Sequence, residues 1–193
     1  TEVIDYLKAE NDYTAAQLKH TEKLQEHLYE EIVGRIKQDD SSVPYRDNGY
    51  YYLTRYEKGL EYPIYSRKKG SLEAAEEIMI NANTMAADHA YYQAGNLRIS
   101  PNNQLLAYGE DTLGRRIYTL RFKNLATGEF LTDEIPNTSG SCTWANDNQT
   151  IFYSVKDASL RSYKIFKHRI GTPADQDEEV FHEADDTFGT FVY

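Results

Sequence analysis

The sequence predicts a mainly β fold behind a short N-terminal helical segment, and three observations support this prediction. Apolar residues have helical spacing from Glu2 to about Arg35. After Pro44 the chain changes to short runs of β-branched and aromatic residues separated by turn residues. These runs repeat at a constant interval. We therefore expect a helical extension over residues 1–43 and an incomplete β-propeller over residues 44–193.

The helical extension has the spacing of two helices. Ile4 and Leu7 are placed for one face of a short first helix. Residues 14–17 (TAAQ) have the pattern of a capping box, in which Thr14 and Gln17 satisfy free backbone amides. A second helix is therefore predicted to start there.

The predicted second helix carries an apolar stripe. Leu24, Leu28 and Ile32 follow each other at four-residue steps, opposite a charged face. Gly34 weakens the helix, and the turn residues before Pro44 end it. Because an apolar stripe packs on another surface, we expect the β region or a second copy of the chain to cover it.

The remainder of the chain is rich in tyrosine, with 17 copies. Tyrosine suits a half-buried pleated surface, because its ring packs inward while its hydroxyl stays near water. Residues 50–54 (YYYLT) are predicted as one strand, and residues 63–67 open the next. Turn residues at 102–103, 124–128 and 146–148 separate further strands.

An internal repeat lies within this β region. Residues 103–108 (NQLLAY) align with residues 148–153 (NQTIFY) at an offset of 45 residues, the interval from Tyr108 to Tyr153. A weaker earlier copy has Tyr52 and Tyr62 ten residues apart. The same offset relates three further pairs, which are Tyr118 and Tyr163, Leu120 and Ile165, and Leu125 and Ile170.

A period of roughly 40–50 residues with about four strands is typical of a β-propeller blade. Coincidence among tyrosine-rich strands is the alternative, and a solenoid is disfavoured because its repeats are usually shorter or helical. The 150 residues from Pro44 to Tyr193 hold about three blades, with an insertion that includes residues 76–95. Closed propellers have roughly four to eight blades. We therefore expect open sheet edges, through which the chain can self-associate.

The last residues, 188–193 (FGTFVY), have the pattern of the first strand of another blade. The chain is therefore expected to stop within its architecture, as an N-terminal fragment of a longer protein.

Composition excludes several classes of partner. The formal net charge is −10 and the longest basic run is the triplet at 67–69, so nucleic acid is not an expected partner. No apolar run approaches the roughly 18 residues of a membrane span. One cysteine, Cys142, allows no internal disulfide and fits the cytoplasm. The periplasm stays open as an alternative, because the sequence begins at Thr1 and is compatible with a removed signal peptide.

Several stretches resemble one branch of a known family. Residues 6–14 (YLKAENDYT) are similar to the N-terminal helix of prolyl oligopeptidase relatives, and residues 30–46 (EEIVGRIKQDDSSVPYR) resemble the oligopeptidase B (protease II) branch in particular. Residues 61–65, 111–122 and 138–141 continue the resemblance, which runs essentially from end to end.

The resemblance implies a serine peptidase of two domains. A seven-bladed propeller, of which this chain would supply about three blades, caps an α/β-hydrolase domain so that only short peptides reach the active site. The oligopeptidase B branch cleaves after Lys or Arg. Its Ser, Asp and His triad, with the acidic residues that bind the basic side chain, lies mainly in the hydrolase domain, which would follow Tyr193.

The chain lacks the motifs of catalytic and cofactor sites. A hydrolase nucleophile needs a G-x-S-x-G elbow, and the nearest approach, residues 140–142 (GSC), is expected to be a loop between blade strands. Cys142 lies in a strand-like run before Trp144, which predicts a buried structural thiol rather than a nucleophile. No glycine-rich phosphate loop is present. We therefore predict no catalytic and no cofactor-binding residues.

Histidine and acidic residues give no metal or carboxylate site. His20 and His27, two helical turns apart, are expected to be solvated, and the other histidines follow no metal-binding spacing. The adjacent pairs at 39–40 and 185–186 resemble turns rather than the two separated carboxylates of a glycosidase. The acidic clusters at 175–179 and 183–186 are expected to be solvated loops. No metal ligand is predicted.

Two further functions remain as alternatives to the peptidase part that acts on peptide substrates. One is a stand-alone binding module built on a partial propeller. The other is a self-contained hydrolase that uses surface carboxylates such as Asp185 and Asp186. The chain alone is expected to be inactive as a peptidase.

Overall fold

A computed structural model describes residues 1–193, which fall into two units, Thr1–Asp40 and Ser41–Tyr193. The first unit consists of helices and the second of antiparallel strands. The predicted class, mainly β with an N-terminal helical extension and an incomplete propeller, is confirmed, and both of its sheets are open.

The helical unit contains α1 (Glu2–Leu18), the 3₁₀ turn η1 (Lys19–Thr21) and α2 (Glu22–Gly34). The predicted capping box at residues 14–17 is wrong, because α1 continues through it on good helix formers such as alanine and glutamine. The break comes later, at Thr21. Its hydroxyl donates to the Leu18 carbonyl at 2.7 Å and accepts a hydrogen bond from Gln25 of α2.

The apolar stripe of α2 has no partner within its own unit. Leu24, Leu28 and Ile32 expose 56%, 44% and 61% of their surface, and neither helix contains a buried residue. The surface that covers this stripe therefore stays a prediction.

The first sheet of the β unit begins directly after the helices. It comprises β1 (Asp40–Ser41), β2 (Tyr45–Asp47), β3 (Tyr50–Tyr56), β4 (Ile64–Lys69) and β5 (Glu76–Asn81). Both β1 and β2 pair with β3, so together they form one interrupted edge strand, broken around Pro44, which has no amide to donate. The sheet therefore has the four-strand content of one blade.

A short helical connection leads to the second sheet. It consists of α3 (Ala82–Met85) and η2 (Ala86–Asp88). The insertion predicted over residues 76–95 is thus too long, because its ends belong to β5 and β6. These helices lengthen the interval between the first and second repeats. The repeat alignment therefore did not include β5.

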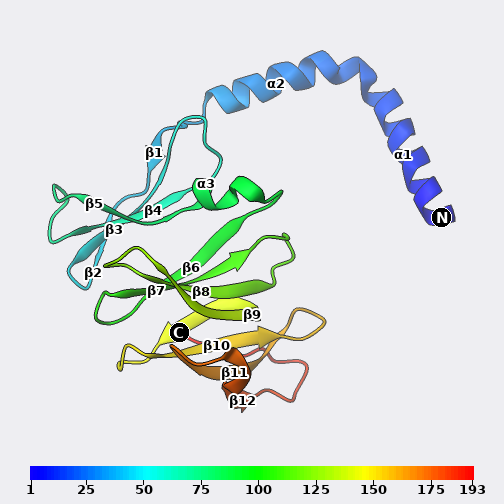
Figure 1. Ribbon diagram of the computed structural model, residues 1–193. Coiled ribbons are helices and arrows are strands. Elements are labelled where there is room, and N and C mark those ends of the chain that lie inside the picture. Colours follow the sequence, from blue (N-terminus) through cyan, green and yellow to red (C-terminus); the bar gives the residue numbers. More distant parts are fainter. The chain divides into compact units, whose positions relative to one another are not determined.

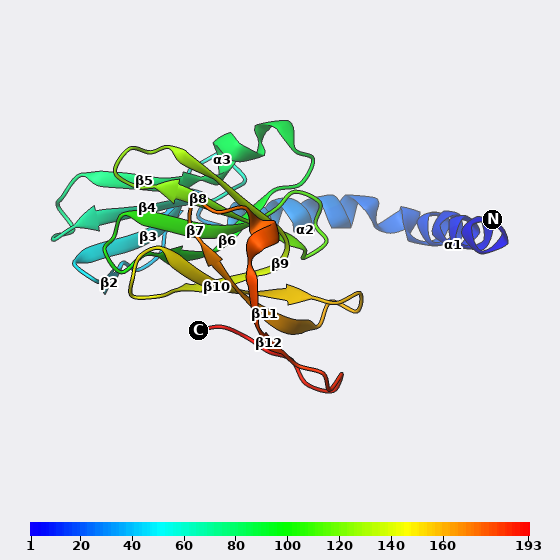
Figure 2. The same ribbon diagram turned by 60° about the horizontal axis from the view of Figure 1, so that its bottom comes forward.

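The second sheet has seven strands in the order β12-β11-β10-β9-β8-β7-β6. They are β6 (Gln93–Ile99), β7 (Leu105–Asp111), β8 (Tyr118–Asn124), β9 (Phe130–Trp144), β10 (Thr150–Lys156), β11 (Ser162–Arg169) and β12 (Glu178–His182), with the turn η3 (Ala174–Gln176) before β12. Figures 1 and 2 show the strands stacked in successive layers from cyan to orange.

Strand β9 belongs to two blades. Its first half pairs with β8, where Ile135 faces Leu120, and its second half pairs with β10, where Trp144 faces Ile151. The strand changes course between the halves, where Asn137 and Gly140 have φ values of 60° and 84°. The seven strands therefore form two consecutive blades, β6–β9 and β9–β12.

The 45-residue repeat is present in the backbone of these two blades. The amide of Ser100 donates to the Leu105 carbonyl at 2.9 Å, and the amide of Ala145 donates to the Thr150 carbonyl at 2.8 Å, 45 residues later. Asn103 and Asn148 occupy equivalent turn positions with φ values of 63° and 60°. The repeat predicted from the sequence is a repeat of structure.

Apolar side chains between the layers form two cores. One joins the first sheet to β6 and β7 through Tyr52, Ile80 and Tyr108. The other joins the second and third blades through Phe122 and Ile151, both fully buried. Full burial of such side chains contributes about 1.5–3 kcal/mol each, so blade-to-blade packing is a main source of stability.

Two local expectations are wrong. Residues 140–142 are part of β9 rather than a loop, and residues 188–193 form no strand. The first strand of a blade pairs with the strand that follows it in the same blade, and residues 188–193 have no such neighbour in this chain. Instead, the amide of Thr190 donates to the Ser162 carbonyl at the start of β11.

Candidate functional site

The two ends of the blade strands have different connections. Because neighbouring strands are antiparallel, their connections alternate between the ends. One end, which we call the short-turn end, carries the turns at 48–49, 70–75, 100–104, 125–129, 145–149 and 170–177. The other, the long-loop end, carries the connections at 57–63, 82–92, 112–117, 157–161 and 183–190.

Exposed apolar side chains gather in the connections of the long-loop end. They are Leu60, Tyr91, Leu113, Ile117 and Phe188, and Leu113 is the most exposed of them at 77%. The short-turn end is instead rich in Asn, Gly and Thr. Exposed apolar groups concentrated on one surface mark an interaction site, so the long-loop end is the candidate interaction face.

The loop between β7 and β8 is held rigidly by Asp111. Its carboxylate, 1% exposed, accepts hydrogen bonds from the amides of Leu113 and Gly114 at 2.9 Å and of Arg116 at 2.8 Å. Burial opposes ionisation of Asp111, but these amide bonds outweigh it and lower its pKa. The loop therefore presents Leu113, Arg115 and Arg116 in a fixed conformation.

The same loop is tied to the next blade. Lys156 of β10 donates to the Arg116 carbonyl at 2.6 Å. The φ of Arg116 is 58°, a conformation that costs a non-glycine residue about 1–2 kcal/mol. The hydrogen bonds that Asp111 accepts and Lys156 donates offset the cost of this backbone conformation.

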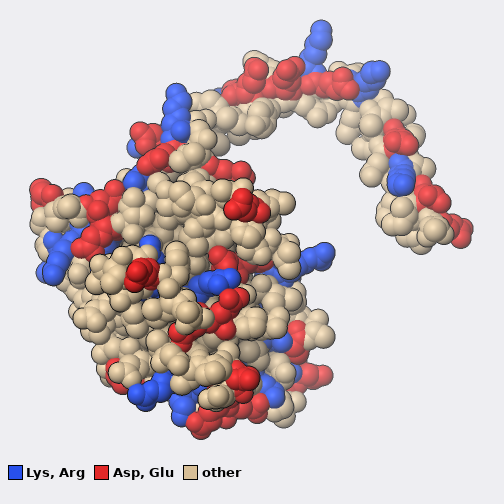
Figure 3. Space-filling view, viewed as in Figure 1, with Lys and Arg blue, Asp and Glu red and all other residues tan.

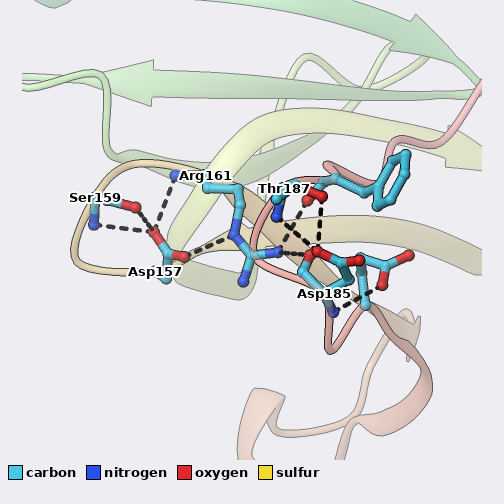
Figure 4. Close-up of polar contacts among 7 residues, drawn as sticks. Asp157, Ser159, Arg161, Asp185 and Thr187 are labelled. Carbon is cyan, nitrogen blue, oxygen red and sulfur yellow. Dashed lines mark hydrogen bonds and ion pairs between the residues drawn. The ribbon is translucent and has the colours of Figure 1, made fainter.

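Arg161 organises the loop between β10 and β11, as Figure 4 shows. Its Nε atom lies 3.0 Å from the Asp157 carboxylate, while Nη1 donates to the carbonyls of Asp185 and Phe188 at 2.9 Å. Hydrogen bonds from Ser159, followed by those from Arg161, lower the pKa of Asp157 to about 2. Arg161 thereby fastens residues 183–190 to the third blade.

The residues considered as nucleophiles do not form a catalytic group. Cys142 is buried, and burial raises the pKa of its thiol to about 12, so the thiol is protonated at neutral pH. Ser141 lies beside it in β9. No serine, threonine or cysteine side chain hydrogen-bonds to a histidine ring, so nothing here activates a nucleophile.

The histidines are dispersed. His20 bonds the Gln17 carbonyl in the helical unit, and His27 lies in α2. His89 stacks on Tyr92, and His182 meets Tyr163 edge-on. No group of three or more His, Cys, Asp or Glu is arranged to hold a metal ion.

His168 is fully buried between two carboxylates, and no pattern in the sequence predicts this arrangement. Its Nδ1 atom lies 2.7 Å from Asp177 and its Nε2 atom 3.2 Å from Asp133. Tyr153 donates to Asp177 at 2.8 Å, and the ring of Phe122 stacks on the imidazole. All of these residues lie inside the blades, so the cluster supports the fold.

Asp186 lies in a turn directly after Asp185, whereas Asp40 of the other adjacent pair belongs to strand β1. Asp185 accepts hydrogen bonds from the amide and the hydroxyl of Thr187, as Figure 4 shows. This arrangement offers no acid and base pair for hydrolysis.

A cleft of about 470 Å³ opens between the first strands of the first and second blades. Tyr45 and Asp47 of β2 line one wall, and Arg98 of β6 lines the other. The ring of Tyr45 stacks on Tyr52 with centroids 5.2 Å apart. Sequence reasoning missed this cleft, because 51 positions separate Asp47 from Arg98 and no local pattern relates them.

Charges of both signs are intermixed over the visible face of the β unit, and Figure 3 shows no large single-sign patch there. No helix is both long and apolar enough to cross a membrane.

Comparison with known proteins identifies related sequences. The family model described as prolyl oligopeptidase, N-terminal β-propeller domain, matches residues 1–193. Dipeptidyl aminopeptidase BI of Pseudoxanthomonas mexicana is 43% identical over 97% of this chain and 28% of its own length. Protease 2 of Moraxella lacunata is 34% identical over 100% of the chain and 29% of its own length. The chain thus spans less than a third of these relatives.

Solved structures with a similar fold come from the same group of peptidases. Oligopeptidase B from Leishmania major superposes with a TM-score of 0.90 and 31% identity, over 99% of this chain and 27% of that one. Oligopeptidase B from Trypanosoma brucei, with covalently bound antipain, superposes with a TM-score of 0.86 and 29% identity, over 98% of this chain and 27% of that one. The similarity includes both the helices and the blades.

Proposed function

Because the chain belongs to the prolyl oligopeptidase family through its N-terminal β-propeller domain, we propose that it is the access-controlling part of a serine oligopeptidase that cleaves short peptides after Lys or Arg. Catalysis in this proposal comes from an α/β-hydrolase domain of the same parent protein. The observation that carries the proposal is the similarity to two oligopeptidase B structures over nearly the whole chain.

The long-loop end is the face that we assign to the hydrolase domain. It carries the exposed side chains of Leu60, Tyr91, Leu113 and Ile117. The chain also enters the β unit at this end, because the Ser42 amide bonds the Thr54 carbonyl near the last residue of β3. The loop that carries Leu113 and Ile117 is held by hydrogen bonds to Asp111, which suits a permanent contact.

In this proposal, the size of the opening that the propeller leaves over the active site controls which substrates can enter. A propeller that covers the active site admits short, flexible peptides and excludes folded proteins. This chain supplies three blades of that cover, and its outward edges are β5 and β12. In isolation those edges are free, so we also propose that the chain alone self-associates and has no peptidase activity.

The test uses the complete product of the gene that encodes this chain. Its intact mass is first compared with 22.3 kDa. Reporter peptides with a blocked N-terminus and Lys, Arg or Ala before the fluorogenic group are then assayed. The proposal expects cleavage after Lys and Arg at least about a hundredfold faster than after Ala, which corresponds to about 2.7 kcal/mol. Equal rates, or a native product of 22.3 kDa, would refute it.

One relative favours a second candidate activity. The 43% identical protein is named a dipeptidyl aminopeptidase, so the parent enzyme here could instead release dipeptides from free N-termini. A reporter with a free dipeptide and the same reporter with a blocked amine separate the two activities. Faster cleavage of the free dipeptide would favour this second candidate.

A stand-alone binding module is the remaining alternative, and a native product of 22.3 kDa would favour it. We place the parent enzyme in the cytoplasm, since the chain has one cysteine and that thiol is buried. Fractionation of the source cells with an antibody to this chain tests the location.

A further inference from the structure

The cleft between the first and second blades has features of a ligand site that the proposed catalysis does not use. Its volume of about 470 Å³ lies within the roughly 300–1,000 Å³ that small-ligand pockets occupy. It lies on the first strands of adjacent blades, away from the exposed apolar side chains of the long-loop end. Residues 47 and 98 lie next to the short turns at 48–49 and 100–104.

Two opposite charges in this cleft have no ion-pair partner. Asp47 makes no side-chain hydrogen bond, and the guanidinium of Arg98 bonds only the neighbouring Leu97 carbonyl. Both charges act on the same phenol: burial raises the pKa of Tyr45, Asp47 adds to this effect, and Arg98 opposes it. Asp47, Tyr45 and Arg98 all line this cleft, so a carboxylate and a guanidinium share it with one phenol.

The backbone of both walls is also available. Strand β2 pairs with β3 on one side, β6 pairs with β7 on one side, and the opposite edge of each is unpaired. The edge of β6 is irregular at residues 95–98, where the register shifts and Asn96 has a φ of 54°. An extended peptide adds readily to such an edge through its main-chain amides and carbonyls.

We infer that this cleft binds short peptides that end in Lys or Arg with a free α-carboxylate. The basic side chain lies at Asp47 against the ring of Tyr45, and the terminal carboxylate pairs with Arg98. A cation over a tyrosine ring beside a carboxylate is favourable, and a guanidinium binds a carboxylate in two-pronged geometry. The inference rests on the proposed function, because such peptides are the products of cleavage after Lys or Arg.

Other ligands fit the two charges less well. A peptide with a neutral C-terminal residue leaves Asp47 desolvated without a counter-charge, and a peptide amide does the same to Arg98. Both side chains are exposed in the free chain, so a ligand that covers one of them without a counter-charge removes its hydration without compensation. An anionic ligand meets repulsion from Asp47. The cleft is therefore specific for a residue that carries both charges.

Photo-crosslinking tests the site directly on the complete gene product. The probe is a benzophenone-containing peptide that ends in Ala-Arg with a free carboxylate, and peptide mapping locates the adduct. We expect adducts within residues 45–54 and 95–99. The yield should fall at least about fivefold in Asp47→Asn and in Arg98→Gln, and also for the same probe with a C-terminal amide.

Matched variants control for loss of charge elsewhere. Glu129→Gln and Lys69→Gln remove the same charges from exposed, unpartnered side chains near the short-turn end and outside the cleft, and they should crosslink like the wild type. Thermal unfolding of each variant confirms that it is folded. The absence of an adduct in the cleft, or a yield there that is equal in Asp47→Asn and Glu129→Gln, overturns the inference.

The outcome separates this inference from the proposed function. Normal cleavage after Lys and Arg without an adduct in the cleft overturns the product site alone. An adduct that depends on Asp47 and Arg98, without cleavage after Lys or Arg, retains the peptide site and refutes the proposed activity.

Discussion

The side-chain oxygen of Asn148 lies 2.7 Å from the backbone amide of Asn102 and accepts a hydrogen bond from it. These residues occupy corresponding turns in consecutive blades, so the repeated turns also hold the blades together. A second link runs parallel to it, since the Trp144 indole donates to the Arg98 carbonyl at 3.0 Å. Polar links between turns therefore supplement the apolar core.

Replacement of Asn148 should show what the turn link contributes. Asn148 has a φ of 60°, so Asn148→Gly removes the hydrogen bond while keeping a permitted conformation. We expect a loss of about 1 kcal/mol in the free energy of unfolding for Gly. Asn148→Ala should lose about 1–2 kcal/mol more, because it adds backbone strain. Urea denaturation measures both, and equal values for Ala and Gly would contradict the strain argument.

Gly140 should tolerate no side chain. Its φ is 84°, and an added Cβ would lie 2.7 Å from Cγ of Tyr118. Gly140→Ala should therefore cost about 2–5 kcal/mol, the sum of backbone strain and overpacking. Gly128 has a similar φ of 78° with nothing within 4 Å, so Gly128→Ala isolates the backbone cost. If the two variants unfold at the same urea concentration, the close approach to Tyr118 is not significant.

Removal of the His168 imidazole should strongly destabilise the third blade. His168→Leu leaves the carboxylates of Asp133 and Asp177, whose side chains are 5% and 3% exposed, without their shared partner. Buried charges that lose a partner cost about 3–5 kcal/mol. The control Lys167→Ala breaks an exposed pair with Glu178 and should cost less than about 1 kcal/mol. Calorimetric unfolding distinguishes these losses.

The order of residues 183–190 should depend on pH through Asp157. Its pKa is about 2 in the folded chain, against about 3.9 in an unfolded one. A lowered folded pKa means that the contribution to stability is complete above about pH 4 and is lost as the pH falls toward 2. The amide signal of Thr190 in NMR spectra should shift over this range. Asp157→Asn should abolish that titration, and a titration that persists in this variant would exclude Asp157 as its source.

Sequence periodicity was sufficient to predict the blades. The offset that relates Tyr108 to Tyr153 reflects matching hydrogen bonds at the turns, which need asparagine at left-handed positions. The capping pattern at Thr14 failed because local helix propensity favoured continuation of α1. The choice between starting a new helix at Thr14 and continuing α1 depends on small differences in free energy, which a sequence pattern does not reveal.

Contacts between distant residues were beyond sequence reasoning. His168 meets Asp133 across 35 positions, and Asp47 shares a cleft with Arg98. Each pair depends on the register of adjacent strands, and a shift of one residue would reverse the direction of every side chain. A nucleophile elbow, by contrast, is a short sequence motif, G-x-S-x-G, so its absence is visible in the sequence itself.

The candidate interaction face gives a last prediction. Leu113 is exposed and lies in a loop that Asp111 holds by three amide hydrogen bonds, so Leu113→Asp should change the stability of this chain by less than about 0.5 kcal/mol. On the proposed function, the same variant in the complete gene product should lower kcat/KM by about tenfold, because a charge at this face opposes docking of the proposed hydrolase domain, at a cost of about 1.4 kcal/mol. Leu72→Asp alters a leucine of 43% exposure at the short-turn end and should keep kcat/KM within about twofold. Kinetics on a Lys or Arg reporter decide between the two ends: a larger loss for Leu72→Asp would place the hydrolase domain at the short-turn end instead.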